Sequence, residues 1–215
     1  MSFVFIFNNI NNIFLAIWSV LIILVALRFF YPAWVKNVSY TWFVVAAISI
    51  HFFYGALVTW GQYYVWANGN TFTQSLLSAH LPVEAPLPSA IEWTRPYFEQ
   101  PLGYFSYYVF GRLWLNIIIL FLISGFFYSV LKLWSFYRGG FLPNGPEIIL
   151  ALLLISGYPG ILVLVPLGFI MSIIWFTILY FKNRTTVVPP MYIEPVFLIA
   201  TPAVLFFSKT ILSYI

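Results

Sequence analysis

Long runs of apolar residues, separated by short polar stretches, follow one another along most of the chain. Most of these runs have about twenty residues or more, the length that an α-helix needs to cross a hydrocarbon core of about 30 Å. The pattern therefore predicts an all-α fold, a polytopic membrane helix bundle with about six transmembrane helices. The six segments are residues 13–34, 41–60, 107–136, 147–158, 160–181 and 191–213.

The fourth segment, residues 147–158, is shorter than the others. At 1.5 Å per residue it reaches only about 18 Å, too little for a full hydrocarbon core. We therefore expect it either to be covered by neighbouring helices or to lie where the membrane is thinned. The stretch from Gly157 to Gly160, with a proline between the two glycines, predicts a tight turn into the fifth segment.

The composition agrees with a membrane protein. Hydrophobic residues make up 63% of the chain and charged residues 7%, whereas a soluble domain has about a quarter of its residues charged. The lipid bilayer is therefore the expected surrounding and the first expected partner. The length suits one membrane domain, residues 1–215, and the cations are too scattered to indicate nucleic-acid binding.

The positions of the cations predict an orientation, because cytoplasmic loops are enriched in Lys and Arg. Three short connections, after the first, third and fifth segments, hold six of them: Arg28, Lys36, Lys132, Arg138, Lys182 and Arg184. The other side holds Arg95, Arg112 and Lys209. This distribution places the N-terminus outside and predicts a multi-pass protein of the cell's inner (plasma) membrane. The first dozen residues carry no cation, so we expect the first segment to be retained rather than cleaved as a signal peptide.

Residues 61–106 form the one sizeable segment predicted outside the membrane, on the external side. The segment contains Glu84, Glu92 and Glu99, five prolines and many aromatic residues. It predicts an irregular loop with a short interfacial helix near residues 71–80. The Trp and Tyr residues around it are typical of the headgroup region.

Few side chains are candidates for chemistry. The chain has no cysteine and no aspartate, and it shows no zinc-ligand spacing, phosphate-binding glycine loop or Ser-His-Asp order. We therefore expect no cofactor and no metal. His51 lies inside the second segment, where a buried structural role is favoured over a proton or ligand role. Asn116, in the third segment, is interpreted as a helix–helix contact, and His80 is too isolated to form a metal site with His51.

Two glutamates lie at the starts of apolar segments. Glu147 follows Pro146, and Glu194 precedes a proline, so each carboxylate is favourably placed against the positive end of a helix dipole. The predicted topology places both at one membrane face. Two carboxylates at such a boundary could also share a proton and activate a water molecule.

The second half of the chain resembles the type IV prepilin peptidase family. These are membrane aspartyl proteases that cleave leader peptides from pilin precursors. Residues 124–164 (SGFFYSVLKLWSFYRGGFLPNGPEIILALLLISGYPGILVL) resemble the family's sequence of helix, Arg-Gly, Gly-x-Gly-Asp, short apolar helix and Gly-Trp/Tyr-Pro. FKNRTT and EPVFLIATPAVLFF further on resemble its basic loop and the start of its last span. FFYPAWVKNVSYTWF, residues 29–43, resembles its first catalytic loop, and the likeness covers about 25–60 and 107–210.

The resemblance implies a catalytic pair at the cytoplasmic ends of two helices, where the family has two aspartates. Here Phe29 stands at the first position and Glu147 at the second, and Glu194 replaces a family glycine on the same face. We therefore expect a prepilin-peptidase-like protein that lacks the standard aspartyl protease activity and binds pilin-like leader helices. The large cysteine-bearing N-terminal region of bifunctional members is missing, so their methyl-transfer activity is not implied.

Two alternatives remain open at this point. Glu147 and Glu194 could act as an atypical carboxylate pair in an active leader peptidase. Otherwise the chain could be a small channel or transporter subunit, with His51 and Asn116 facing a polar path. Segments two and three contain few of the polar residues that such a path usually needs.

Overall fold

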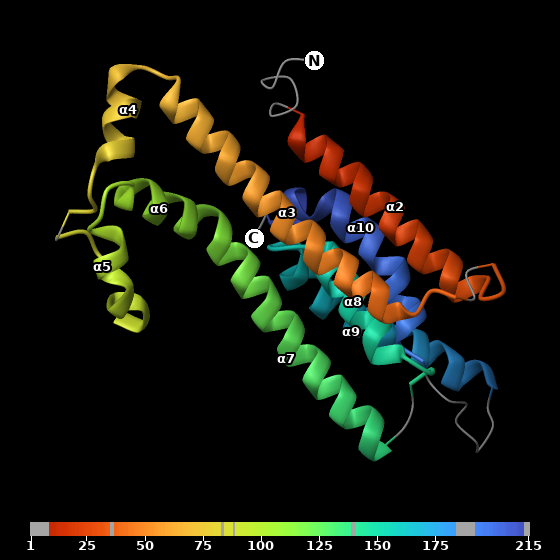
Figure 1. The fold of residues 1–215 in the computed structure, drawn as a ribbon. Helices are drawn as coiled ribbons and strands as arrows, with labels where there is room; N and C mark the ends of the chain where they lie inside the picture. Colours follow the sequence, from red (N-terminus) through yellow and green to blue (C-terminus); the bar gives the residue numbers. More distant parts are fainter. Residues whose placement is uncertain are drawn as a thin grey trace. The chain divides into compact units, whose positions relative to one another are not determined.

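The computed structural model describes residues 9–34, 37–82, 84–87, 89–138, 141–183 and 192–212 of the 215-residue chain, and the regular elements in these ranges are all helices (Figure 1). The all-α prediction is therefore confirmed for the part of the chain that is described. Lys36, Arg184 and residues 1–8 lie outside these ranges, as do the side chains of Arg138 and Lys209. The predicted orientation, with the N-terminus outside, stays a prediction.

The helices form two compact units, and the divisions between them fall inside two long helices. The first unit is described over His51–Ile118, and the second within Asn8–Ile50 and Ile119–Ile215. One helix, α3 (Tyr40–Ala67), runs from the second unit into the first, and α7 (Leu115–Arg138) returns to the second.

Four helical stretches of the described residues are long and apolar enough to cross a membrane. They are Ile10–Phe30, Tyr40–Ala67, Gly103–Tyr137 and Gly160–Lys182. Two shorter apolar helices, α8 (Gly145–Ser156) and α10 (Glu194–Leu212), correspond to the fourth and sixth apolar segments. The lengths and compositions of these helices indicate a membrane protein, and the count of six spans stays a prediction.

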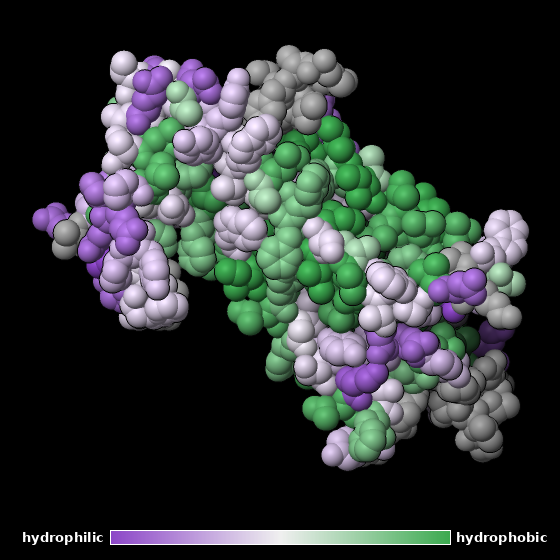
Figure 2. All heavy atoms as spheres, viewed as in Figure 1, coloured by the Kyte–Doolittle hydropathy of each residue, from purple (hydrophilic) through white to green (hydrophobic). Residues whose placement is uncertain are grey.

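The surface of α2 (Ile10–Phe30) supports this conclusion. One side of the helix is buried, with Val25 fully enclosed, whereas Val20 and Ile23 on its other side are each 57% exposed. Figure 2 shows hydrophobic side chains covering the outer side of α2 and hydrophilic side chains beyond its C-terminal end. A continuous apolar surface of this kind is unfavourable in water and is expected against lipid.

The short helix α8 is the core of the second unit. It packs against α10, against α9 (Gly160–Asn183) and against α2, and its residues from Ile148 to Ile155 are almost all buried. A helix that is apolar all round is stable only where neighbours surround it. The expectation that the short fourth segment is covered by other helices is therefore confirmed.

The turn between α8 and α9 is as tight as the sequence predicts. Gly157 ends α8 with φ 66°, in the left-handed region that glycine adopts without steric cost, and α9 begins at Gly160. Further along α9, Gly168 lies against the ring of Phe197 on α10, where a Cβ atom would come within 2.6 Å of the ring. The missing side chain lets the two helices pack closely.

The first unit contains the segment that was expected to be an irregular loop. That expectation is wrong for much of its length, because α3 continues to Ala67 and is followed by α4 (Thr71–Ser78), η1 (Ser89–Thr94) and α5 (Arg95–Phe98). The predicted short helix near residues 71–80 is confirmed as α4. Aromatic contacts join these helices to the next one. The ring centroid of Trp66, near the end of α3, lies 5.3 Å from that of Phe105 in α6 (Gly103–Val109).

Candidate functional site

Two residues, Asn144 and Pro146, set the backbone at the start of α8. Asn144 occupies the N-cap position with φ 63° and ψ 22°, a left-handed conformation that Asn tolerates better than most residues. Pro146 then occupies the first turn, where its missing N–H would have no partner in any case. This arrangement fixes Glu147 in the first turn of α8, as the sequence predicts.

The Glu147 carboxylate is bonded to two side chains of α7. Its Oε1 accepts hydrogen bonds from Lys132 Nζ at 2.6 Å and from Tyr128 Oη at 3.3 Å. The two donors are four residues apart and therefore lie one above the other on the same face of the helix. The Lys132 side chain is 57% exposed and that of Glu147 16% exposed, so the ion pair lies at the edge of the packed core.

The second oxygen of the Glu147 carboxylate differs from the first in its hydrogen bonding. Oε2 is buried and has no hydrogen-bond partner among the described residues, and the same is true of the Ser124 hydroxyl, one turn before Tyr128 on α7. Buried polar atoms are normally paired, so unpaired ones indicate either a bound molecule or a functional constraint. The α7 face that contacts Glu147 thus carries three polar side chains, Ser124, Tyr128 and Lys132, which a lipid-facing surface would not favour.

Glu194 begins α10 and is completely buried, with 0% of its surface exposed. Its Oε1 accepts a hydrogen bond of 2.8 Å from the backbone N–H of Leu142, in the turn that precedes α8. Gly145 leaves the space for this oxygen, because a Cβ atom built on Gly145 would overlap Glu194 Oε1. The side chain therefore connects the start of α10 to the start of α8.

The other oxygen of Glu194, Oε2, is also buried and without a hydrogen-bond partner. Within the described residues Glu194 forms no ion pair, since the two ion pairs found there are Lys132–Glu147 and Arg95–Glu92. A buried carboxylate without a cation is costly when charged. Among the described contacts, Glu194 is therefore compensated by a backbone donor and not by a cation.

The structure places Glu147 and Glu194 at the starts of two helices that pack against each other, α8 and α10. No hydrogen bond joins the two carboxyl groups in the described residues, because each Oε1 is bonded to another partner and each Oε2 to none. The hypothesis that the pair shares a proton through a bound water stays a prediction.

Phe29 is the remaining residue that the sequence resemblance singles out. It lies in the last turn of α2, half-buried, with its ring edge-to-face against Phe30 at 5.1 Å. The neighbouring Arg28 donates to the carbonyls of Val38 and Pro32, each at 3.0 Å, and so braces the turn toward α3. A phenyl ring cannot transfer a proton, so this end of α2 offers no acid or base at the family position.

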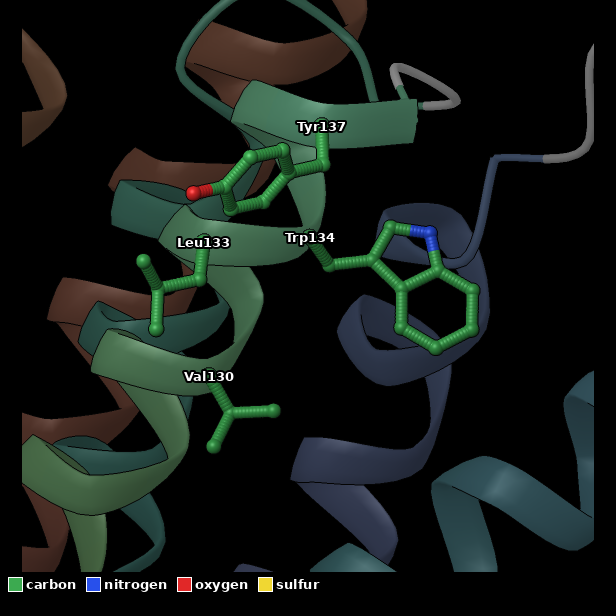
Figure 3. A pocket seen from close by; sticks show the side chains of 4 residues that line it. All are labelled: Val130, Leu133, Trp134 and Tyr137. Carbon is green, nitrogen blue, oxygen red and sulfur yellow. The ribbon is translucent and has the colours of Figure 1, made fainter.

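On another face of α7, four side chains line a shallow apolar hollow of about 570 Å³: Val130, Leu133, Trp134 and Tyr137. Figure 3 shows them on one side of the helix, with the Trp134 indole and the Tyr137 ring extending in opposite directions. The helical spacing places Lys132 on the opposite side, toward Glu147. One face of α7 is thus polar and bonded to α8, and the other is apolar and open.

Two other candidates do not belong to this site. His51 lies in the first unit and is 8% exposed, so it is buried as expected, and its role stays a prediction. Asn116 donates its side-chain amide to the carbonyl of Arg112, 3.2 Å away in its own helical run, so its expected helix–helix contact is not what the structure shows. Arg112 lies one turn earlier, in the π-helical turn η2 (Phe110–Trp114).

Sequence reasoning missed the partners of both glutamates. Tyr128 and Lys132 could have been found from their spacing of four residues and from the position of Lys132 near the predicted cytoplasmic end of the third segment. Leu142 could not, because the interacting group is a backbone N–H. Within the described residues no cluster of His or acidic side chains suitable for a metal ion is present.

The chain matches no protein-family model, no curated protein and no solved structure.

Proposed function

We propose that this chain is a prepilin-peptidase-like protein of the inner membrane that binds pilin-like leader helices without cleaving them. The observation that carries the proposal is the engagement of both carboxyl groups by their own protein. Glu147 is neutralised by Lys132 at 2.6 Å, and Glu194 is held by the Leu142 N–H at 2.8 Å.

These contacts disfavour aspartyl-protease chemistry for a physical reason. Such chemistry needs two carboxyl groups that share one proton and hold a water between them. Lys132 favours the charged form of Glu147 and occupies Oε1, while Phe29 offers no carboxyl group at the other family position. Under the proposal, the short buried α8 corresponds to the family's short helix, and neither Glu147 nor Glu194 is free to act as the family's aspartates do.

The open face of α7 supports a binding role. Leu133, Trp134 and Tyr137 are 59%, 60% and 76% exposed, and they form an i, i+1, i+4 apolar patch with Val130 one turn earlier. An apolar helix recognises such a patch through side chains three and four residues apart. A leader helix within the bilayer is the partner that this surface fits under the proposal.

Co-purification with a tagged pilin-like precursor tests the binding. The wild-type chain is expected to retain the precursor, and the Leu133→Ala/Trp134→Ala variant to lose several-fold of it. Ile174→Ala/Trp175→Ala is the matched control, because these adjacent residues on α9 are also an aliphatic residue and a Trp and are 54% and 50% exposed. Equal retention by both variants, or no enrichment over an unrelated membrane protein, would contradict the proposal.

A second candidate function rests on a different observation. Both carboxyl groups keep one buried oxygen without a partner, at the starts of adjoining helices. A water bound by these oxygens would make Glu147 and Glu194 an atypical catalytic pair in an active leader peptidase. Cleavage of the precursor by the purified wild-type chain, abolished equally by Glu147→Gln and Glu194→Gln, would establish this candidate. Absence of cleavage by the wild-type chain would refute it.

A further inference from the structure

The helix α3 is longer than a bilayer requires. It has 28 residues, which at 1.5 Å per residue reach about 42 Å, against about 30 Å for the hydrocarbon core. A tilt of about 20° shortens the span only slightly. The C-terminal turns of α3, which include Trp66, therefore extend into the headgroup layer if the helix crosses the membrane.

An aromatic cluster surrounds this end of α3. The Trp66 ring lies 6.3 Å from Tyr104, 5.3 Å from Phe105 and 5.2 Å from Tyr108, measured between ring centroids. Trp and Tyr are enriched at membrane–water interfaces, where their rings are apolar and their N–H and O–H groups reach water. The composition of the cluster agrees with the depth that the length of α3 assigns to it.

The helix α4 is attached rigidly to this cluster. It begins after only three residues, its cap residue Asn70 accepts a hydrogen bond from Thr73 N at 2.9 Å, and Gln74 Nε2 donates to the carbonyl of Ala67 at 3.2 Å. Leu77 is buried against the cluster together with the partly buried Leu76. The orientation of α4 is thus fixed by the end of α3.

One side of α4 is mainly apolar. At 100° per residue, Phe72, Leu76 and Leu77 fall within one arc of the helix, which also contains Thr73. The remaining arc holds the polar residues Thr71, Gln74, Ser75 and Ser78. Packing on the cluster accounts for Leu76 and Leu77, but it leaves Phe72 67% exposed.

The charges near α4 do not favour anionic lipid. The helix itself carries no charged residue. Between residues 61 and 106 the only cation is Arg95, and it forms an ion pair with Glu92, while Glu84 and Glu99 add two further negative charges. Attraction to anionic headgroups needs several unpaired cations, which this segment lacks.

We propose that α4 lies in the interface of the bilayer that α3 crosses, with Phe72 inserted among the upper acyl chains of zwitterionic lipid and Ser78 facing water. Burial of an apolar ring drives the insertion, and electrostatic attraction contributes little. The inference does not depend on the function proposed for the second unit.

The absence of cysteine makes a direct test available. Single-cysteine variants Phe72→Cys and Ser78→Cys carry nitroxide spin labels on the full-length chain in phosphatidylcholine vesicles. The two positions are about 120° apart around the helix and both exposed, so neither label has to enter a packed core. We expect the label at 72 to be several-fold more accessible to oxygen than to a water-soluble nickel chelate, and the label at 78 to show the reverse.

Equal accessibility of the two labels to the nickel chelate would overturn the proposal, since both would then face water. A second measurement adds anionic phosphatidylglycerol to the vesicles. An unchanged depth at position 72 supports apolar insertion, and a large increase in depth would overturn the assigned lipid preference. Helical content measured by circular dichroism confirms that each labelled variant has folded.

Discussion

Replacing Gly145 by alanine tests whether Glu194 is packed as described. The new Cβ would overlap Glu194 Oε1 and approach the Cβ of Phe141 to 3.0 Å. Glu194 is 0% exposed, so its carboxyl group has no open space into which to move. Its displacement would break the 2.8 Å bond from the Leu142 N–H and leave a donor without a partner.

The expected magnitude follows from these losses. A hydrogen bond to a charged or buried group contributes about 1.5–3 kcal/mol, and overpacking of a tight core costs about 1–3 kcal/mol. Alanine is a better helix former than glycine by up to about 1 kcal/mol, which offsets part of this. We therefore expect Gly145→Ala to lower the free energy of unfolding by about 2–4 kcal/mol.

The assay is unfolding by SDS titration in mixed micelles, followed by circular dichroism. Gly125→Ala is the matched control, because a Cβ atom on Gly125 meets nothing within 4 Å and should stabilise α7 by about 0.5–1 kcal/mol. In a Glu194→Ala background the additional cost of Gly145→Ala should vanish, which gives a coupling energy of about 2 kcal/mol or more. Equal stability of the Gly145 and Gly125 variants would refute the described packing of Glu194.

Three further substitutions can be measured in the same titration. Lys132→Met should lower the free energy of unfolding by about 1–2 kcal/mol, since it removes the cation bonded to the Glu147 carboxylate and leaves the Tyr128 hydroxyl. The double variant Lys132→Met/Glu147→Gln should recover most of this loss. No recovery would argue against the ion pair. Asn144→Val should cost about 1–2 kcal/mol because of its φ of 63°, whereas Asn144→Gly should cost nothing, and equal effects would contradict that conformation. Gly168→Ala should cost about 1–3 kcal/mol through overlap with the Phe197 ring, compared with the same open-glycine control.

The apolar runs predict most of the helices correctly because lipid exposure leaves a strong hydropathy signal. The prediction fails after residue 60, where Gly61 and Gln62 end the apolar run but α3 continues to Ala67. The last turns of α3 are held by contacts of Trp66 with aromatic residues about forty positions further on. Hydropathy within a short window carries no information about such distant contacts.

The candidate site was predictable only in part. The positions of Glu147 and Glu194 in first turns follow from adjacent prolines and from the helix dipole. The hydrogen bond from the Leu142 N–H to Glu194 joins residues 52 positions apart. Its donor is a backbone group, so no pattern of side chains in the sequence predicts it. The role of Gly145 likewise becomes visible only when the carboxyl group beside it is located.

The near-complete burial of α8 has a consequence for how the protein is made. Twelve residues are too few to be stably inserted on their own as they leave the ribosome, and α10, which covers α8, is synthesised after it. Until α10 arrives, α8 and its neighbours expose surfaces that the finished protein encloses. A chain truncated before residue 192 would therefore keep its first spans but remain a substrate for membrane quality-control proteases. Synthesis of α10 thus completes the packing around α8.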